Sequence, residues 1–177
     1  MKNTRRLFFL GLFALVIGSV ELSANAHAAA TGDGFDRLKA LTGDWVDADG
    51  AADGSSRPIV ARYSVTAGGT AVMETLFPGT AHEMVTLYTH EGKALVLTHY
   101  CAAGNQPHMH AGEFNGHSLS FVLDGGANIN TKVDTHMHSV KHEFVNGDEL
   151  RSEWQSWEKG KPDGPAKIFH LKRLATS

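Results

Sequence analysis

Short runs of alternating apolar and polar residues fill most of the chain after position 57. Alternation with a period of two predicts half-buried β-strands. The strands predicted in this way lie near 57–66, 70–77, 82–90, 93–101, 107–114, 117–123, 136–146, 148–157 and 165–173. Turn residues separate the runs, and Asn115-Gly116 and Asn146-Gly147 each lie between two alternating runs. Asn-Gly in that position is typical of a tight β-hairpin.

One segment before these runs has a helical spacing instead. Phe35, Leu38 and Leu41 are three residues apart, which predicts a short amphipathic helix over 35–41. Trp45 then opens a first short strand. About ten strands, each expected to pair with its sequence neighbour, predict a mostly β fold with a single antiparallel up-and-down barrel and one short N-terminal helix. Such a barrel leaves no exposed sheet edge.

The N-terminus has a different pattern. Three of the first six residues are basic, and the uncharged run LFFLGLFALVIGSV over 7–20 is followed by small residues with Ala-x-Ala spacing. That order predicts a secretory signal peptide over 1–28, followed by the barrel domain over 29–177. The uncharged run is shorter than the ~20 residues that span a bilayer. We therefore expect a periplasmic or secreted protein without stable membrane insertion after signal cleavage.

Composition narrows the classes of partner. The whole chain has a net charge of -3, and the predicted signal peptide carries +2 of it, so 29–177 carries -5. A mildly acidic surface argues against nucleic acid and anionic membranes as partners. Cys101 is the one cysteine, so no internal disulfide can form. The composition points to no particular oligomeric state.

The strand 136–146 predicts which of its side chains face inward. Its even positions hold three histidines together with Val140 and Phe144, and its odd positions include Lys141 and Glu143. Because the charged face should contact water, the three histidines are expected to point into the barrel.

The same reasoning predicts an interior that suits a small ligand. The apolar residues expected there are Leu95, Leu97, Leu119, Phe121 and Trp154. The residues expected to contact a ligand are His99, His117 and Trp154 on strands, with Asn105 and Gln106 in the loop over 102–107. The alternative for these two is that they satisfy backbone groups of the turn. An apolar cavity with a few polar groups favours a small aromatic or amphipathic molecule. Binding such a molecule in a partly apolar, histidine-lined interior is the first functional hypothesis.

Histidine and cysteine support a second hypothesis. Three pairs have a spacing of two residues: His99/Cys101, His108/His110 and His136/His138. On a strand, both members of such a pair share a face. Imidazole and thiolate are ligands of Zn²⁺ and copper. These six residues therefore predict a metal- or haem-binding barrel, with Zn or Cu favoured over haem; the alternative is that they are hydrogen-bonded or solvated lining.

A third hypothesis is an enzyme that uses histidine and glutamate in acid–base chemistry. Glu74 and Glu83 lie on predicted strands among apolar residues, so either could be an inward carboxylate that acts as a general base. His99 and Cys101 diverge along one strand, so His99 alone is a poor base for a cysteine nucleophile.

Several motifs together resemble a known group of barrels. The segment FDRLKALTGDW at 35–45, the antiparallel hairpins and a last strand ending in Arg173 resemble the calycin-like barrels, which include lipocalins, fatty-acid-binding proteins and haem-binding nitrobindins. With 68–74, 99–107 and 169–173, the chain more closely resembles secreted bacterial proteins of the DUF1579-like group. In lipocalins the tryptophan of Gly-x-Trp packs against an arginine of the final strand. The resemblance therefore implies a contact between Trp45 and Arg173.

Overall fold

The computed structural model describes residues 34–50 and 57–175. The predicted signal peptide at 1–28 lies outside the described residues. The predicted helix is present as α1 (Phe35–Lys39), whose Phe35 and Leu38 are buried. Among the described residues, no helix is both long and apolar enough to cross a membrane.

The remaining elements are almost all strands, close to the ranges that the alternation predicts. They are β1 (Gly43–Asp47), β2 (Ile59–Thr66), β3 (Ala71–Leu76), β4 (Met84–Glu91), β5 (Ala94–Tyr100), β6 (Gln106–Ala111), β7 (Ser118–Ala127), β8 (His136–Phe144), β9 (Glu149–Glu158), β10 (Lys161–Pro162) and β11 (Lys167–Arg173). A single 3-10 turn, η1 (Ala67–Gly69), joins β2 to β3.

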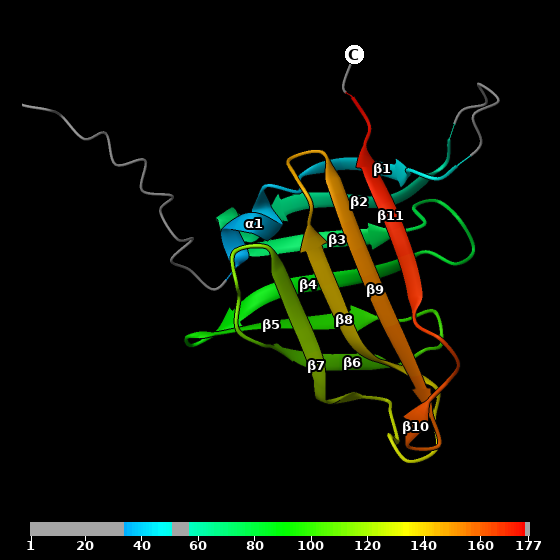
Figure 1. Ribbon diagram of the computed structural model, residues 1–177. Helices are drawn as coiled ribbons and strands as arrows, with labels where there is room; N and C mark the ends of the chain where they lie inside the picture. The colour runs from blue at the N-terminus through cyan, green and yellow to red at the C-terminus, as the bar shows by residue number, and fades with distance from the viewer. Residues whose placement is uncertain (1–33, 51–56, 176–177) are drawn as a thin grey trace, which may run out of the picture.

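These strands close into one antiparallel barrel. Each strand from β1 to β9 pairs with the next, β9 also pairs with β11, and β11 pairs with β1. The short β10 pairs only with β9, so ten strands form the closed barrel. Figure 1 shows β7, β8, β9 and β11 crossing steeply in front of β2 to β6. The predicted fold class, a mostly β up-and-down barrel with one short helix, is confirmed.

The two ends of the barrel differ. Connections 67–70, 92–93, 112–117 and 145–148 lie at the end that α1 covers, which we call the helix end. Connections 77–83, 101–105, 128–135 and 159–166 lie at the opposite end, which we call the loop end. Apolar side chains from α1 and from both layers of strands form one continuous core between the two ends.

The helix end is fastened by the contact that the resemblance implies. The guanidinium carbon of Arg173 lies 4.5 Å from the centre of the Trp45 ring, which is fully buried. Arg173 also donates hydrogen bonds to the carbonyl groups of Ala40, Leu41 and Thr42. Arg173 therefore joins the C-cap residue of α1 and the two residues after it to the last strand while packing on Trp45.

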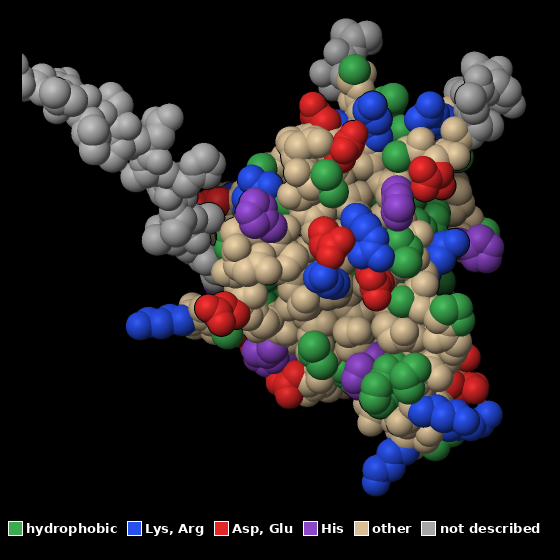
Figure 2. All heavy atoms as spheres, in the orientation of Figure 1, with side chains coloured by type: hydrophobic (Ala, Val, Ile, Leu, Met, Phe, Trp, Pro, Cys, Tyr) green, Lys and Arg blue, Asp and Glu red, His purple; other side chains and the backbone are tan. Residues whose placement is uncertain are grey.

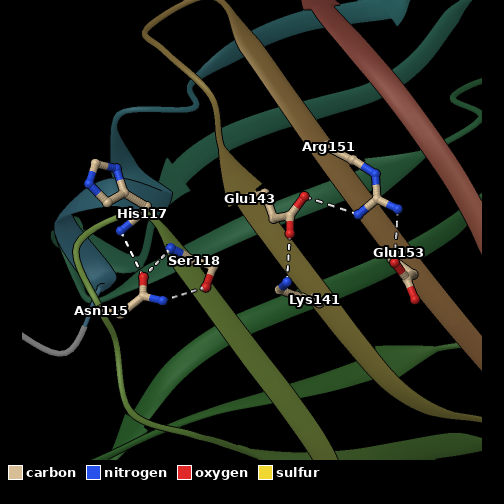
Figure 3. Close-up of polar contacts among 7 residues, drawn as sticks. All are labelled: Asn115, His117, Ser118, Lys141, Glu143, Arg151 and Glu153. Atoms are coloured by element: carbon tan, nitrogen blue, oxygen red, sulfur yellow. Dashed lines mark hydrogen bonds and ion pairs between the residues drawn. The ribbon is translucent and has the colours of Figure 1, made fainter.

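Charged side chains lie on the outer face of β8 and β9, as their odd-numbered positions predict. Glu143 pairs with both Lys141 and Arg151, and Arg151 also pairs with Glu153. Figure 3 shows these side chains linked across the two strands, and Figure 2 shows charges of both signs over this side of the molecule. The opposite positions are therefore the ones that face the core.

Candidate functional site

A pocket opens into the barrel at the loop end. Its volume is about 250 Å³, and its lining includes Phe77, Met84, His99, Met137, Trp154 and Phe169. Most of these side chains lie at or next to the strand ends of the loop end, and Trp154 lies in the middle of β9. We call this cavity the loop-end pocket. The exposed surface of its wall is apolar.

Two side chains of the lining each have a buried nitrogen atom without a hydrogen-bond partner. The side chains of His99 and Trp154 are only 1% and 3% exposed, and their ring centres lie 5.0 Å apart. Among the described residues, neither Nε2 of His99 nor Nε1 of Trp154 has a partner. A buried polar group without a partner costs about 1–3 kcal/mol. The pair therefore leaves one unsatisfied nitrogen on each of two side chains that line the loop-end pocket.

The contact of the other ring nitrogen of His99 bears on whether Nε2 donates or accepts a hydrogen bond. Nδ1 lies 2.9 Å from Oγ1 of Thr86. Burial raises the pKa of the Glu74 carboxyl group, and the Thr86 hydroxyl acts against that rise. A hydroxyl has one proton, so if Thr86 donates it to Glu74, its oxygen accepts from Nδ1–H. Burial lowers the pKa of His99 to about 4, so the imidazole is neutral at pH 7. Nε2 is then a hydrogen-bond acceptor.

Behind His99 lies a group of five buried polar side chains. Tyr63 and Tyr88 each place their hydroxyl 2.6 Å from one oxygen of Glu74. Tyr88 also lies 2.9 Å from Nε2 of His142, and Nδ1 of His142 lies 2.9 Å from Oγ of Ser152. Burial raises the pKa of the Tyr63 hydroxyl, and Ser152 acts in the opposite direction. All five are at most 1% exposed, and we call them the buried ring.

Each member of the buried ring has a hydrogen-bond partner within the group. The hydroxyls of Tyr63 and Tyr88 donate to the two oxygens of Glu74, and His142 lies between Tyr88 and Ser152. Burial favours the neutral forms, because it raises the pKa of the Glu74 carboxyl group and lowers the pKa of His142 to about 3.

The structure separates the six predicted metal ligands. His99 lies inside the barrel, Cys101 follows β5 and is half-buried, and His108 and His110 lie on β6 on either side of the fully buried Met109. Their alternation with Met109 puts both imidazoles on the outer face. The fold therefore does not bring all six residues together at one place.

His136 is buried, with 1% of its surface exposed, but neither it nor His138 lines the loop-end pocket or joins the buried ring with His142, as a shared inward face predicts. A bulge between Met137 and Ser139 interrupts the pairing of β8 with β9 and ends the alternation there. Met137 lines the loop-end pocket instead. The ring of His138 stacks on Trp157 with centres 3.7 Å apart, and both histidines line a second cavity of about 470 Å³. Of the three predicted inward histidines on β8, His142 alone joins the buried ring.

Three predicted ligand contacts have other surroundings. Asn105 donates to the carbonyl of Thr135 at 2.8 Å, and Gln106 accepts from Asn128 at 2.8 Å, so both tie loop-end segments together. His117 is exposed, and Figure 3 shows its position beside Asn115, which accepts its backbone N–H at 3.0 Å. None of the three predicted residues lines the loop-end pocket.

One group of three possible metal ligands is present among the described residues. A ligand atom from each of Glu91, His108 and His110 lies within 4.8 Å of the others. Glu91 is not predicted from the sequence. This residue lies on β4, two strands from β6, so the spacing of histidines along β6 does not indicate it.

No model of a known protein family matches the chain, and no curated protein shows significant similarity to it. Functional conclusions therefore depend on the geometry of these groups.

Proposed function

We propose that the barrel binds a small, mostly apolar molecule with one hydroxyl group in the loop-end pocket. The observation that carries this proposal is the pair of buried, unpartnered atoms, Nε2 of His99 and Nε1 of Trp154. A hydroxyl group both donates and accepts, so it can donate to the imidazole nitrogen and accept from the indole N–H. An apolar molecule without such a group would leave both atoms unpaired.

The size and lining of the pocket limit the ligand further. A volume of about 250 Å³ lies below the roughly 300–1,000 Å³ of pockets for drug-sized ligands. Phe77 and Phe169 offer aromatic surface, while Met84 and Met137 have flexible side chains that adapt to different shapes. These features support simple phenols and short-chain alcohols as the ligand class.

Acid–base catalysis by an inward glutamate has less support. Glu74 is fully buried within the buried ring, and it does not line the loop-end pocket. Glu83 accepts a hydrogen bond from the backbone N–H of Gly79 at 2.6 Å in an exposed connection. Neither carboxylate faces a molecule bound beside His99, so binding without chemistry is the function that the pocket favours.

Calorimetric titration with phenol and with toluene tests the proposal. The two compounds have similar shapes, but toluene lacks the hydroxyl group. We expect the protein to bind phenol more tightly than toluene. A Trp154→Phe variant keeps an aromatic ring but removes the N–H donor. It should bind phenol about 3- to 10-fold more weakly, the effect of one hydrogen bond, with little change for toluene.

A Trp157→Phe variant is the matched control, because Trp157 lines the second cavity and not the loop-end pocket. It should bind phenol as the unaltered protein does. Equal affinity for phenol and toluene in the unaltered protein would contradict the proposal. So would an equal loss of phenol affinity in both tryptophan variants, or no binding of either compound.

A further inference from the structure

We propose that the outer face of the barrel holds a binding site for a divalent transition metal of the Zn²⁺ class, formed by Glu91, His108 and His110. One potential ligand atom of each residue lies within 4.8 Å of the others. The site is independent of the loop-end pocket, because the two histidines point away from the interior.

The strands bring these residues together. His108 and His110 lie on the outer face of β6, where they pair with Thr98 and Val96 of β5. Glu91 is the last residue of β4, which flanks β5 on its other side. Its long side chain places Oε1 3.6 Å from Nε2 of His108. Two imidazoles and one carboxylate thus converge from strands that the barrel holds in fixed register.

Both imidazoles already have the outer partners that metal-binding histidines use. Nδ1 of His110 lies 2.8 Å from a carboxylate oxygen of Asp124, and Nδ1 of His108 lies 3.2 Å from the Thr98 hydroxyl. A histidine that binds a metal through one ring nitrogen usually donates from the other to a carboxylate, carbonyl or water, which fixes the ring and its tautomer. Here these contacts hold Nδ1 of each ring and leave Nε2 as the atom for a metal.

The donor set selects the class of metal. Two imidazole nitrogens and one carboxylate oxygen suit Zn²⁺, whereas Mg²⁺ and Ca²⁺ prefer oxygen ligands alone. Tetrahedral bonds of 2.0–2.1 Å place ligand atoms about 3.3 Å apart, so the three side chains must draw slightly closer than they are. The side chains of Glu91 and His110 are 61% and 42% exposed, which leaves them room to rotate. Three protein ligands would leave a fourth position for water.

Titration of the untagged, metal-free protein with Zn²⁺ by calorimetry tests the site, with Mg²⁺ as the comparison ion. We expect one Zn²⁺ per chain and no comparable binding of Mg²⁺. His108→Ala and His110→Ala should each weaken Zn²⁺ binding at least about tenfold, since each removes a ligand. Asp124→Asn keeps all three ligands but removes the charged partner of His110, so it should weaken binding by about tenfold.

A His170→Ala variant is the matched control. His170 is also exposed and also lies near a carboxylate, with Nδ1 3.4 Å from Asp49. It should bind Zn²⁺ like the unaltered protein, and thermal unfolding should show that all variants fold. Zn²⁺ affinity that is unchanged in both His108→Ala and His110→Ala would overturn the proposal. So would an equal loss in His170→Ala, or no Zn²⁺ binding by the unaltered protein.

Discussion

Glu74 is the residue on which the polar interior depends. Its carboxyl group contacts the hydroxyls of Tyr63 and Tyr88 at 2.6 Å. Burial raises the pKa of this group, whereas those two hydroxyls and that of Thr86 act in the opposite direction. A neutral side chain with one donor and one acceptor in the same place should therefore preserve the buried ring.

Substitution of Glu74 by glutamine and by leucine tests this at a single residue. In Glu74→Gln, the amide oxygen can accept from Tyr63 and the amide nitrogen can donate to Tyr88. We expect a loss of less than ~1 kcal/mol in the free energy of unfolding. Glu74→Leu leaves buried hydroxyls without partners and should cost about 2–5 kcal/mol. Urea unfolding at pH 7 measures both, and equal losses would contradict the neutral ring.

For a single residue, the sequence predicts the face of the strand on which its side chain lies, but not the side chains that it contacts. The alternation puts His99 on the same face as Leu95 and Leu97, and Trp154 among the interior residues, and the structure has these four side chains buried. It does not predict that Thr86 contacts His99, since the two lie on different strands. That contact depends on the register of β4 against β5, which pairs Thr86 with His99. In the same way, Tyr63 reaches Glu74 because the register of β2 against β3 pairs these two residues.

At the scale of elements, the alternation predicts where strands lie but not where bulges interrupt them. Bulges occur between His108 and Met109 in the pairing of β6 with β7, and between Met137 and Ser139 in that of β8 with β9. A bulge is a property of two paired strands, so the pattern of one strand does not show it. This is why the prediction for His138 was wrong, while that for His142, beyond the bulge, was correct.

The end of β7 offers a test of how closely β6 and β7 approach. Gly125 and Gly126 have φ angles of 141° and 148°, which residues with a side chain rarely adopt. A Cβ at Gly126 would lie 2.3 Å from the carbonyl oxygen of Gln106, whereas a Cβ at Gly125 would meet nothing within 4 Å. The first position therefore combines backbone strain with a clash, and the second has strain alone.

We expect Gly125→Ala to lower the free energy of unfolding by about 1–3 kcal/mol, the usual cost of a strained backbone conformation. Gly126→Ala should cost at least ~1 kcal/mol more, because β6 must also move away from the new methyl group. Urea unfolding of the two variants side by side measures the difference. Equal losses would show that the strands separate without cost at this point.

At the scale of the whole molecule, the buried ring joins the two layers of the barrel. Tyr63, Glu74 and Tyr88 come from β2, β3 and β4, whereas His142 and Ser152 come from β8 and β9. Figure 1 shows these two groups of strands on opposite sides of the interior. Closure of the barrel followed from the number of strands and their turns, but the polar links across its interior required the three-dimensional arrangement. Protonation of those links should therefore affect the stability of the entire fold.

Acidification should destabilise the barrel through its two most deeply buried imidazoles. Burial lowers the pKa of His99 to about 4 and that of His142 to about 3, from the ordinary value of 6.5. Between pH 6.5 and 4, the unfolded chain therefore binds protons that the folded chain does not, and stability falls as the pH falls. Each histidine should remove about 2 kcal/mol between pH 7 and pH 5.

Glu74 acts in the opposite direction, and this makes the pH dependence testable. Because the pKa of its buried carboxyl group is raised, the folded chain binds a proton above pH 4.5 that the unfolded chain does not, so this group adds stability as the pH falls. Glu74→Gln removes that contribution and leaves the two imidazoles. We therefore expect the free energy of unfolding, measured in urea at pH 7.5, 6 and 5, to fall more steeply with acidification in Glu74→Gln than in the unaltered protein. A Glu74→Gln variant whose stability stays constant from pH 7.5 to 5 would show that the buried imidazoles gain protons without unfolding the barrel.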